Sequence, residues 1–310
     1  MSATNERVAP APAPRIVLLG ADGQLGWELR RALLPLGEVV AWGRAEADLS
    51  ELDALRAQLD RVRPQVIVNA AAYTAVDRAE QEVALATCIN ADAPALLAQW
   101  AAEHDAWLVH YSTDYVFDGT RDAPYDEACA PNPQSAYGRS KLAGELAVAA
   151  SGCRHLTLRT SWVYAARGGN FARTMLKLAR ERELLRVVAD QFGAPTAAEL
   201  IADVSALALH RLLGDAGFAA RAGGLYHLSA AGATSWHGYA QYVLEQARAF
   251  GAELRCRELA PISTAEYPLP APRPANSRLD CTRLQQAFGV HLPDWQVQVQ
   301  RMLRELLLPR

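Results

Sequence analysis

Short apolar runs alternate with stretches of helical periodicity through the first half of the chain. Each run has the length and continuous apolar character of a buried parallel strand, and each helical stretch repeats its apolar residues every three or four positions. Strands are predicted at Arg15 to Gly20, Glu38 to Trp42, Gln65 to Ala70 and Trp107 to Tyr111, and helices at Gln24 to Leu36, Leu52 to Val62 and Asn90 to Glu103. This alternation predicts an α/β fold with a doubly wound parallel sheet.

Three glycines follow the first predicted strand and open the first predicted helix. Gly20, Gly23 and Gly26 stand at three-residue spacing. Glycines allow the backbone to approach a pyrophosphate, and the helix N-terminus supplies N–H donors and the positive end of a dipole. A turn that only packs is the alternative. We favour a dinucleotide site of the Rossmann type, with contacts from Gly20, Gly23, Gln24, Leu25 and Gly26.

The end of the second strand indicates which cofactor binds. A carboxylate at this point contacts the adenosine ribose in NAD-binding folds, whereas this chain has Gly43 and Arg44. A guanidinium suits a 2′-phosphate, which favours NADPH. Asp48, followed by Leu49, could still reach the ribose, so NADH stays open.

Small and hydroxylated residues follow the third and fourth strands, at the edge where open α/β sheets bind ligands. Ala71, Ala72, Tyr73 and Thr74 are predicted to contact the cofactor, as is Tyr111. Ser112 and Thr113 could hydrogen-bond a substrate carbonyl, although Ser-Thr before Asp114 is also a common helix cap.

A phenol and an ammonium stand four residues apart at Tyr137 and Lys141. If Ser135 caps a helix here, the two side chains lie on one face. A neighbouring cation stabilises the phenolate and lowers the tyrosine pKa from about 10. The chain has 31 basic residues but only two lysines, which argues against an accidental pairing.

The second half of the chain is richer in helix. Strands are predicted at His155 to Trp162, Leu185 to Ala189 and Leu225 to Leu228; helices at Phe171 to Arg182, after Thr196 to about Leu213, Trp236 to Phe250, Leu284 to Phe288 and Trp295 to Leu307. We expect a disordered tail over residues 1–14 and a Rossmann domain over 15–165, to which 185–230 return in part. Residues 166–184 and 231–310 should form a smaller, α-rich substrate lobe.

The composition of the chain argues against nucleic acid and membranes as binding partners and favours a small molecule. The net charge is −3, with both signs spread along the chain and no basic stripe for nucleic acid or a membrane surface. Five cysteines without a Cys-x-x-Cys pair argue against disulfides and thiolate zinc sites. Since no apolar stretch could span a bilayer, we expect a cytoplasmic protein.

The glycine turn, the hydroxyls after the fourth strand and the Tyr-x-x-x-Lys pair together resemble the extended short-chain dehydrogenase/reductase family. Within it, six segments are similar to the dTDP-4-dehydrorhamnose reductases: Gly26 to Leu29, Val68 to Ala72, His110 to Phe117, Arg159 to Tyr164, Asp190 to Thr196 and Arg273 to Asp280. The resemblance runs from about residue 15 to the C-terminus.

This resemblance implies a reaction and a role for each site residue. The family reduces the C4 ketone of dTDP-4-dehydro-L-rhamnose to dTDP-L-rhamnose for cell-surface polysaccharide. By analogy, Tyr137 donates a proton to the C4 oxygen, Lys141 holds the nicotinamide ribose and lowers the Tyr137 pKa, and Thr113 polarises the ketone. Asp114 and Trp162 would contact the substrate, although Trp162 could instead be a core aromatic.

The resemblance also suggests a bound metal ion and a homodimer. Some members are described as Mg²⁺-dependent, with glutamates at a dimer contact that match Glu28, Glu199 and Glu305. Isolated helix glutamates are usually solvated, and residue chemistry alone does not predict this site.

Two other functions stay open. One is a related nucleotide-sugar epimerase or dehydratase. Dehydratases commonly place extra acid/base carboxylates directly after the catalytic threonine, whereas here Asp114 is followed by Tyr115 rather than by a glutamate. The other is a non-catalytic, NADP-binding regulatory subunit, which would be expected to lose Tyr137 or Lys141.

Overall fold

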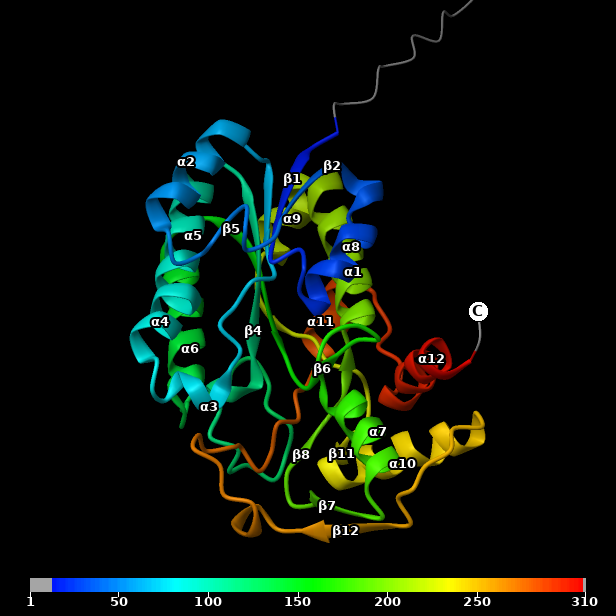
Figure 1. Ribbon diagram of the computed structural model, residues 1–310. Helices are drawn as coiled ribbons and strands as arrows, with labels where there is room; N and C mark the ends of the chain where they lie inside the picture. Colours follow the sequence, from blue (N-terminus) through cyan, green and yellow to red (C-terminus); the bar gives the residue numbers. More distant parts are fainter. Residues whose placement is uncertain (1–12, 309–310) are drawn as a thin grey trace, which may run out of the picture.

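A parallel sheet forms the centre of the computed structural model, which describes residues 13–308. Among these residues six strands lie in the order β10-β5-β4-β3-β1-β2 (Figure 1). Their bounds are β1 (Arg15–Leu19), β2 (Glu38–Trp42), β3 (Val66–Asn69), β4 (Trp107–Thr113), β5 (Arg154–Thr160) and β10 (Gly224–His227). All but two residues of the tail predicted at 1–14 lie outside the described part.

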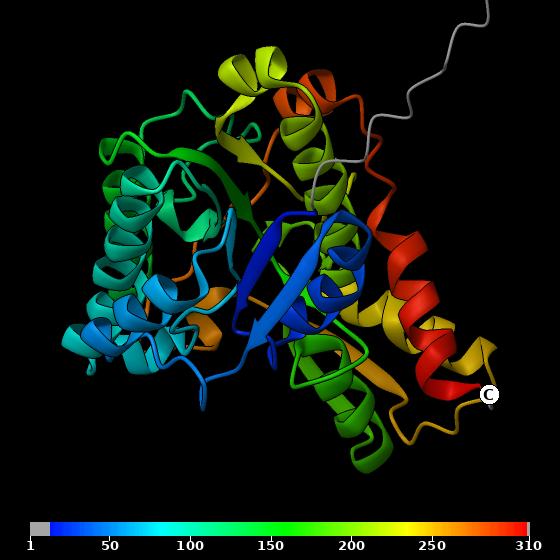
Figure 2. The same ribbon diagram turned by 90° about the horizontal axis from the view of Figure 1, so that it is seen from above.

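Helices cover both faces of this sheet. One face carries α1 (Gln24–Ala32), α8 (Ala198–Gly214) and α9 (Ala216–Ala222); the other carries α2 (Leu52–Val62), α5 (Ala93–Glu103) and α6 (Ala136–Ala150) (Figures 1 and 2). Strand β1 explains why both faces are covered: Ile16 and Leu18 enter one hydrophobic core, while Val17 and Leu19 enter the other. The predicted doubly wound α/β fold is confirmed.

A smaller lobe lies below the carboxyl ends of these strands (Figure 1). It contains α7 (Phe171–Glu181), α10 (Trp236–Ala249) and two short sheets. The sheets pair β7 (Leu184–Val188) with β12 (Glu258–Ile262), and β8 (Phe192–Gly193) with β11 (Thr234–Ser235). Strand β7 therefore lies outside the central sheet, and α8 and β10 make the return to it. The division into domains at the predicted residues stays a prediction.

The remaining elements connect or flank these layers. They are α3 (Val76–Ala79), α4 (Val83–Thr87), β6 (Val163–Tyr164), β9 (Thr196–Ala197), α11 (Thr282–Phe288) and α12 (Trp295–Leu307). No helix in residues 13–308 is both long enough and apolar enough to cross a membrane.

Several boundaries differ from the sequence prediction, most by one or two residues, and three of the differences are more substantial. Helix α1 ends at Ala32, and a separate 3-10 turn over Leu34–Leu36 contains Pro35, which cannot continue an α-helix from within. Helix α5 begins at Ala93 because a π turn, Cys88–Asp92, precedes it. We also expected a proline-rich loop from Pro261 to Pro274, but strand β12 includes its first two residues. Pro261 is tolerated there because the strand belongs to a two-stranded pair.

Candidate active site

Helix α6 presents the predicted phenol and ammonium from one buried face. Ser135 caps it as predicted, with its Oγ accepting a hydrogen bond from Gly138 N at 3.1 Å. Tyr137 is 9% exposed and Lys141 is 2% exposed. Both side chains are therefore held in a dry environment at the carboxyl edge of the sheet.

Lys141 is directed to the end of β4. Its Nζ donates a hydrogen bond to the carbonyl oxygen of Tyr111 at 2.7 Å. Burial lowers the pKa of Lys141 to about 8, and the negative charge of Glu145 opposes that lowering. The ammonium group is therefore only marginally favoured in this site.

Tyr137 differs from the sequence expectation. Burial raises its pKa to about 12, and a hydrogen bond with Thr113 opposes the rise. We expected Lys141 to lower this pKa, but in this structure desolvation outweighs every lowering contribution, and the ammonium is bonded to Tyr111. Tyr137 therefore holds its proton firmly at neutral pH.

The hydroxyl and carboxyl groups after β4 gather beside Tyr137. Thr113 Oγ1 lies 3.1 Å from Asp114 Oδ1 and accepts a hydrogen bond from Tyr115 N at 3.2 Å. Burial raises the pKa of Asp114 to about 6. Several buried polar atoms here lack a protein partner, namely Ser112 Oγ, Asp114 Oδ2 and Thr160 Oγ1. Buried polar atoms normally have partners, which points to a ligand at this edge.

The glycine turn fits the pyrophosphate of a dinucleotide. Gly20 has φ +74°, and a Cβ there would lie 2.7 Å from Ala71 N, while a Cβ at Gly26 would overlap the Gly20 carbonyl. Gly23 is the N-cap of α1 and offers no side chain to the first N–H groups. The first turn, which includes Gln24 and Leu25, has no acidic residue, so its N–H donors are available to an anion.

Arg44 and Asp48 lie together after β2. Arg44 Nε is 2.9 Å from Asp48 Oδ2, and the arginine side chain is 78% exposed. The other carboxylate oxygen accepts from Ser50 N and Oγ, and these bonds are the main cause of a lowered Asp48 pKa. Leu49 is buried. The acid is thus engaged locally, whereas the guanidinium is accessible.

Sequence reasoning missed Asn90, which joins the cofactor loop to the catalytic helix. Asn90 is fully buried; its Oδ1 accepts from Tyr73 N at 2.9 Å, and its Nδ2 lies 3.0 Å from Tyr73 O and from Ser140 Oγ. Gly144 allows this contact, because a Cβ there would overlap the Asn90 carbonyl. An asparagine within an apolar helical run was the available signal, and it falls in the π turn. Ala72 and Thr74 lie in the same loop.

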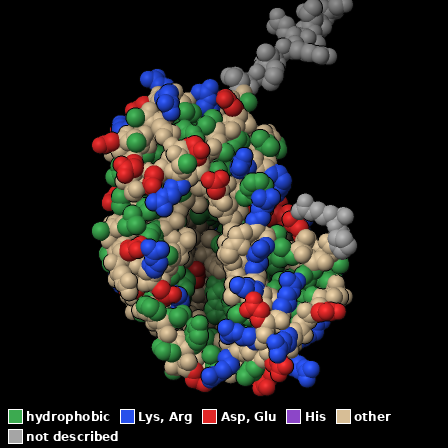
Figure 3. All heavy atoms as spheres, viewed as in Figure 1, with side chains coloured by type: hydrophobic (Ala, Val, Ile, Leu, Met, Phe, Trp, Pro, Cys, Tyr) green, Lys and Arg blue, Asp and Glu red, His purple; other side chains and the backbone are tan. Residues whose placement is uncertain are grey.

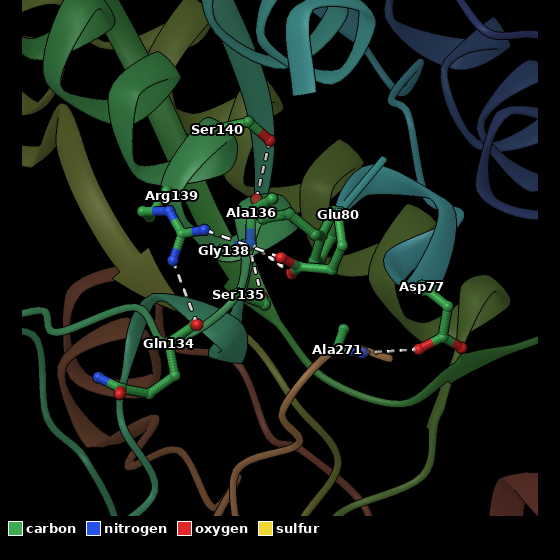
Figure 4. A network of polar contacts seen from close by, with 10 residues as sticks. Asp77, Glu80, Gln134, Ser135, Ala136, Gly138, Arg139, Ser140 and Ala271 are labelled. Carbon is green, nitrogen blue, oxygen red and sulfur yellow. Dashed lines mark hydrogen bonds and ion pairs between the residues drawn. The ribbon is translucent and has the colours of Figure 1, made fainter. Parts of the chain in front are cut away.

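Two carboxylates, one in α3 and one directly after it, fix a distant loop and the start of α6 (Figure 4). Glu80 Oε1 accepts from Ala136 N at 2.7 Å, in the first turn of the catalytic helix. Asp77 accepts from Ala271 N at 3.2 Å and from Arg273 Nη2 at 2.8 Å. The proline-rich loop is thereby tied across to the Rossmann part of the chain.

Trp162 lies in the smaller-lobe side of the site in an uncommon conformation. Its φ is +48°, and its ring stacks on Trp236 with centroids 3.6 Å apart. A Cβ at Gly193 would lie 2.6 Å from the indole. Packing therefore holds Trp162 in place, and its contact with the substrate stays a prediction.

The face of the molecule drawn in Figure 3 is hollowed near its middle. The hollow lies between the helices of the central sheet and the smaller lobe, at the carboxyl edge of the strands. A cavity of about 130 Å³ lies beside the start of α6 and is lined by Tyr115, Phe117, Asp118, Gln134, Ser135, Pro272, Arg273 and Pro274.

The three glutamates predicted for Mg²⁺ lie elsewhere, around a cavity of about 520 Å³. Arginines share this cavity, and Arg301 is paired with Glu199 at 2.5 Å. Glu28 feels the charges of Glu199 and Glu305, which with burial raise its pKa. No group of three His, Cys, Asp or Glu side chains in residues 13–308 is arranged to hold a metal ion. The structure thus brings the three glutamates to one cavity without arranging them as a metal site, so Mg²⁺ stays a prediction and we derive no step through it.

Comparison with known proteins identifies the family. Residues 14–308 match the family described as RmlD substrate binding domain. The chain is 50% identical over 295 residues to a dTDP-4-dehydrorhamnose reductase of Burkholderia thailandensis, covering 94% of this chain and 99% of that protein. The chain belongs to the dTDP-4-dehydrorhamnose reductase family. A reductase of Escherichia coli K12 is also 50% identical, with 94% and 97% covered.

Solved structures of this family have the same fold. The dTDP-4-dehydrorhamnose reductase of Bacillus anthracis, in complex with NADP, superposes with a TM-score of 0.84 at 33% identity, covering 94% of this chain and 99% of that one. A Clostridium acetobutylicum reductase gives 0.85 at 33% identity, with 94% and 99% covered. The predicted family resemblance is confirmed.

Proposed function

We propose that this chain is an oxidoreductase that reduces the C4 ketone of dTDP-4-dehydro-L-rhamnose to dTDP-L-rhamnose with NADPH or NADH. This is the last step in making dTDP-rhamnose for cell-surface polysaccharide. The observation that carries the proposal is the joint burial of Thr113, Tyr137 and Lys141 at the sheet edge. Membership of the family supports the substrate.

The nicotinamide ring, when bound, supplies the hydride to C4. Thr113 hydrogen-bonds the substrate oxygen and orients it toward Tyr137. Tyr137 gives that oxygen its proton as negative charge develops, so the hydroxyl product leaves neutral. The proton lost by Tyr137 is restored from solvent before the next turnover.

Charge balance explains the need for Lys141. A pKa near 12 keeps Tyr137 protonated at neutral pH but makes it a weak acid. A phenolate in this dry site is costly unless a cation stabilises it in the transition state. Lys141, one helical turn along α6, supplies that cation and, on cofactor binding, also a donor for the nicotinamide ribose.

NADPH is the cofactor that the end of β2 favours. The Arg44 guanidinium is exposed and can pair with a 2′-phosphate, while the Asp48 carboxylate is held by Ser50. Mg²⁺, a homodimer and a cytoplasmic location stay predictions, and no step of the proposal depends on them.

Turnover by wild type and Tyr137→Phe tests the proposal. We expect oxidation of NADPH, followed by its near-ultraviolet absorbance, to require dTDP-4-dehydro-L-rhamnose and to fall about 10²- to 10⁴-fold in Tyr137→Phe. Tyr267→Phe changes an exposed tyrosine and should match wild type. Tight cofactor binding by wild type without turnover would instead support the regulatory subunit.

A further inference from the structure

A buried ion pair joins the catalytic helix to the sheet one turn beyond Lys141. Glu145 on α6 and Arg159 on β5 have side chains only 6% and 3% exposed. Arg159 Nε donates to both carboxylate oxygens, at 2.9 and 3.2 Å, and Nη2 donates to Oε2 at 2.7 Å. Two guanidinium nitrogens therefore hold the carboxylate, and the pair is shielded from water.

Helical spacing places Glu145 on the catalytic face. It follows Lys141 by four residues and Tyr137 by eight, so the three side chains lie along one side of α6. Burial disfavours the Lys141 ammonium, and Glu145 is the acidic group that opposes this. The ionisable groups on the neighbouring strands come from β4, β5 and β10, together with Asp114 after β4. They are His110, Tyr111, Arg154, His155, Arg159, Tyr226 and His227.

The histidines do not offer a competing charge near neutral pH. His110 is fully buried, and burial together with Lys141 lowers its pKa well below the usual range. His227 Nε2 lies 3.4 Å from Arg159 Nη1, and burial followed by the Arg159 charge lowers its pKa to about 3. Near neutral pH, the buried charges next to Lys141 are therefore those of the Glu145–Arg159 pair.

Arg159 also contacts the segment that follows Thr113. Its guanidinium lies 5.0 Å from the Phe117 ring centroid, and Phe117 stacks on Tyr125 at 4.2 Å. Tyr125 exchanges backbone hydrogen bonds with Arg278 and Asp280 in the C-terminal part of the chain. Through these contacts the ion pair connects α6 both to the segment that follows Thr113 and to the C-terminal part of the chain.

We propose that Glu145, held by Arg159, is a positioning residue that keeps the Lys141 ammonium charged and fixes the catalytic face of α6 against β5. Apolar side chains could join helix to sheet without the cost of burying two ions, so packing alone does not account for the pair. The proposal rests on the proposed reaction for its purpose, but the charge on Lys141 can be measured without turnover.

The chain offers a direct test because Lys141 and Lys177 are its only lysines. Lysine labelled with ¹³C at Cε should give two NMR signals, and Lys177→Arg assigns them. We expect the Lys141 titration midpoint to fall by roughly one pH unit in Glu145→Gln. The basic limb of kcat/KM should move by the same amount, whereas a purely structural role would lower stability and leave the midpoint unchanged.

A second variant and a control keep the test decisive. Glu145→Gln leaves Arg159 unpaired and could unfold, so Glu145→Gln with Arg159→Gln removes both charges and should show the same downward midpoint. Glu103→Gln removes one charge from an exposed pair and should not move it. An unchanged Lys141 midpoint in folded Glu145→Gln or in the folded double variant would overturn the proposal. Failure of wild type to turn over would count against the proposed reaction alone.

Discussion

Lys141 Nζ lies 2.7 Å from the backbone oxygen of Tyr111, so the catalytic helix is hydrogen-bonded directly to strand β4 near its carboxyl end. The lysine comes from α6 and the carbonyl from β4, 30 residues apart. This bond directs the ammonium to the carboxyl edge of the sheet. The charge state of Lys141 is therefore expressed at the edge where the proposed reaction takes place.

The activity should be lost on the alkaline side near pH 8. Lys141 must be cationic, and its pKa is lowered to about 8, so the active form predominates below that pH and declines as pH rises through it. We expect kcat/KM to fall about tenfold per pH unit above the limb. Lys141→Arg should be slow but lack this limb, and Lys177→Arg should retain it. A wild-type profile flat to pH 10 would contradict the assignment.

Asp114→Asn should raise the free energy of unfolding while lowering the activity, since Asp114 is a predicted substrate contact. Burial raises the Asp114 pKa from 3.8 to about 6, so the folded state binds its proton more tightly than the unfolded state. That contribution is complete below the unfolded value and is lost as pH rises through about 6. We expect the variant to gain about 1–3 kcal/mol in unfolding free energy at neutral pH.

Denaturant unfolding across acidic and neutral pH checks this prediction. The variant should lose the decline in stability between about pH 4 and pH 6. Asp122→Asn alters an exposed aspartate and should keep the wild-type curve. Equal curves for Asp114→Asn and wild type would show that Asp114 is not the group responsible.

Gly144→Ala should push helix α6 away from the π turn at Cys88–Asp92 and so lower the stability of the protein. The added Cβ would overlap the Asn90 carbonyl, and overpacking of this kind costs about 1–3 kcal/mol. Since Asn90 bonds both Tyr73 and Ser140, cofactor affinity should fall together with stability. Gly214→Ala meets no atom within 4 Å and should be neutral or stabilising. Thermal unfolding and cofactor titration of both variants measure these effects. Equal stability and equal cofactor affinity of Gly144→Ala and Gly214→Ala would refute the role of the contact between Gly144 and Asn90.

Arg44→Ala should change the choice of cofactor. We expect KM for NADPH to rise about 10- to 100-fold and KM for NADH to change little, because only NADPH has the 2′-phosphate that the guanidinium recognises. Arg56→Ala, which removes an exposed arginine of α2, serves as the control. A parallel rise for both cofactors would mean that Arg44 does not read the 2′ position.

Local signals in the sequence were sufficient for the sheet, the glycine turn and the catalytic helix. The apolar runs between Arg15 and Thr113 have the length of buried strands, and their alternation with amphipathic helices favours a parallel sheet. Ser135 before Tyr137 marks a helix start, and four-residue spacing sets one face. These inferences depend on neighbours within one or two helical turns, which the sequence contains.

Only the tertiary structure decided which distant residues serve that face. Arg159 and Glu145, like Asn90 and Tyr73, meet because β5 and the π turn pack against α6, and no spacing along the chain encodes those contacts. Burial likewise decided the protonation of the site. The Tyr137 pKa rises where the sequence suggested a fall, because desolvation depends on everything packed around the phenol, whereas the Tyr-x-x-x-Lys motif specifies one neighbour.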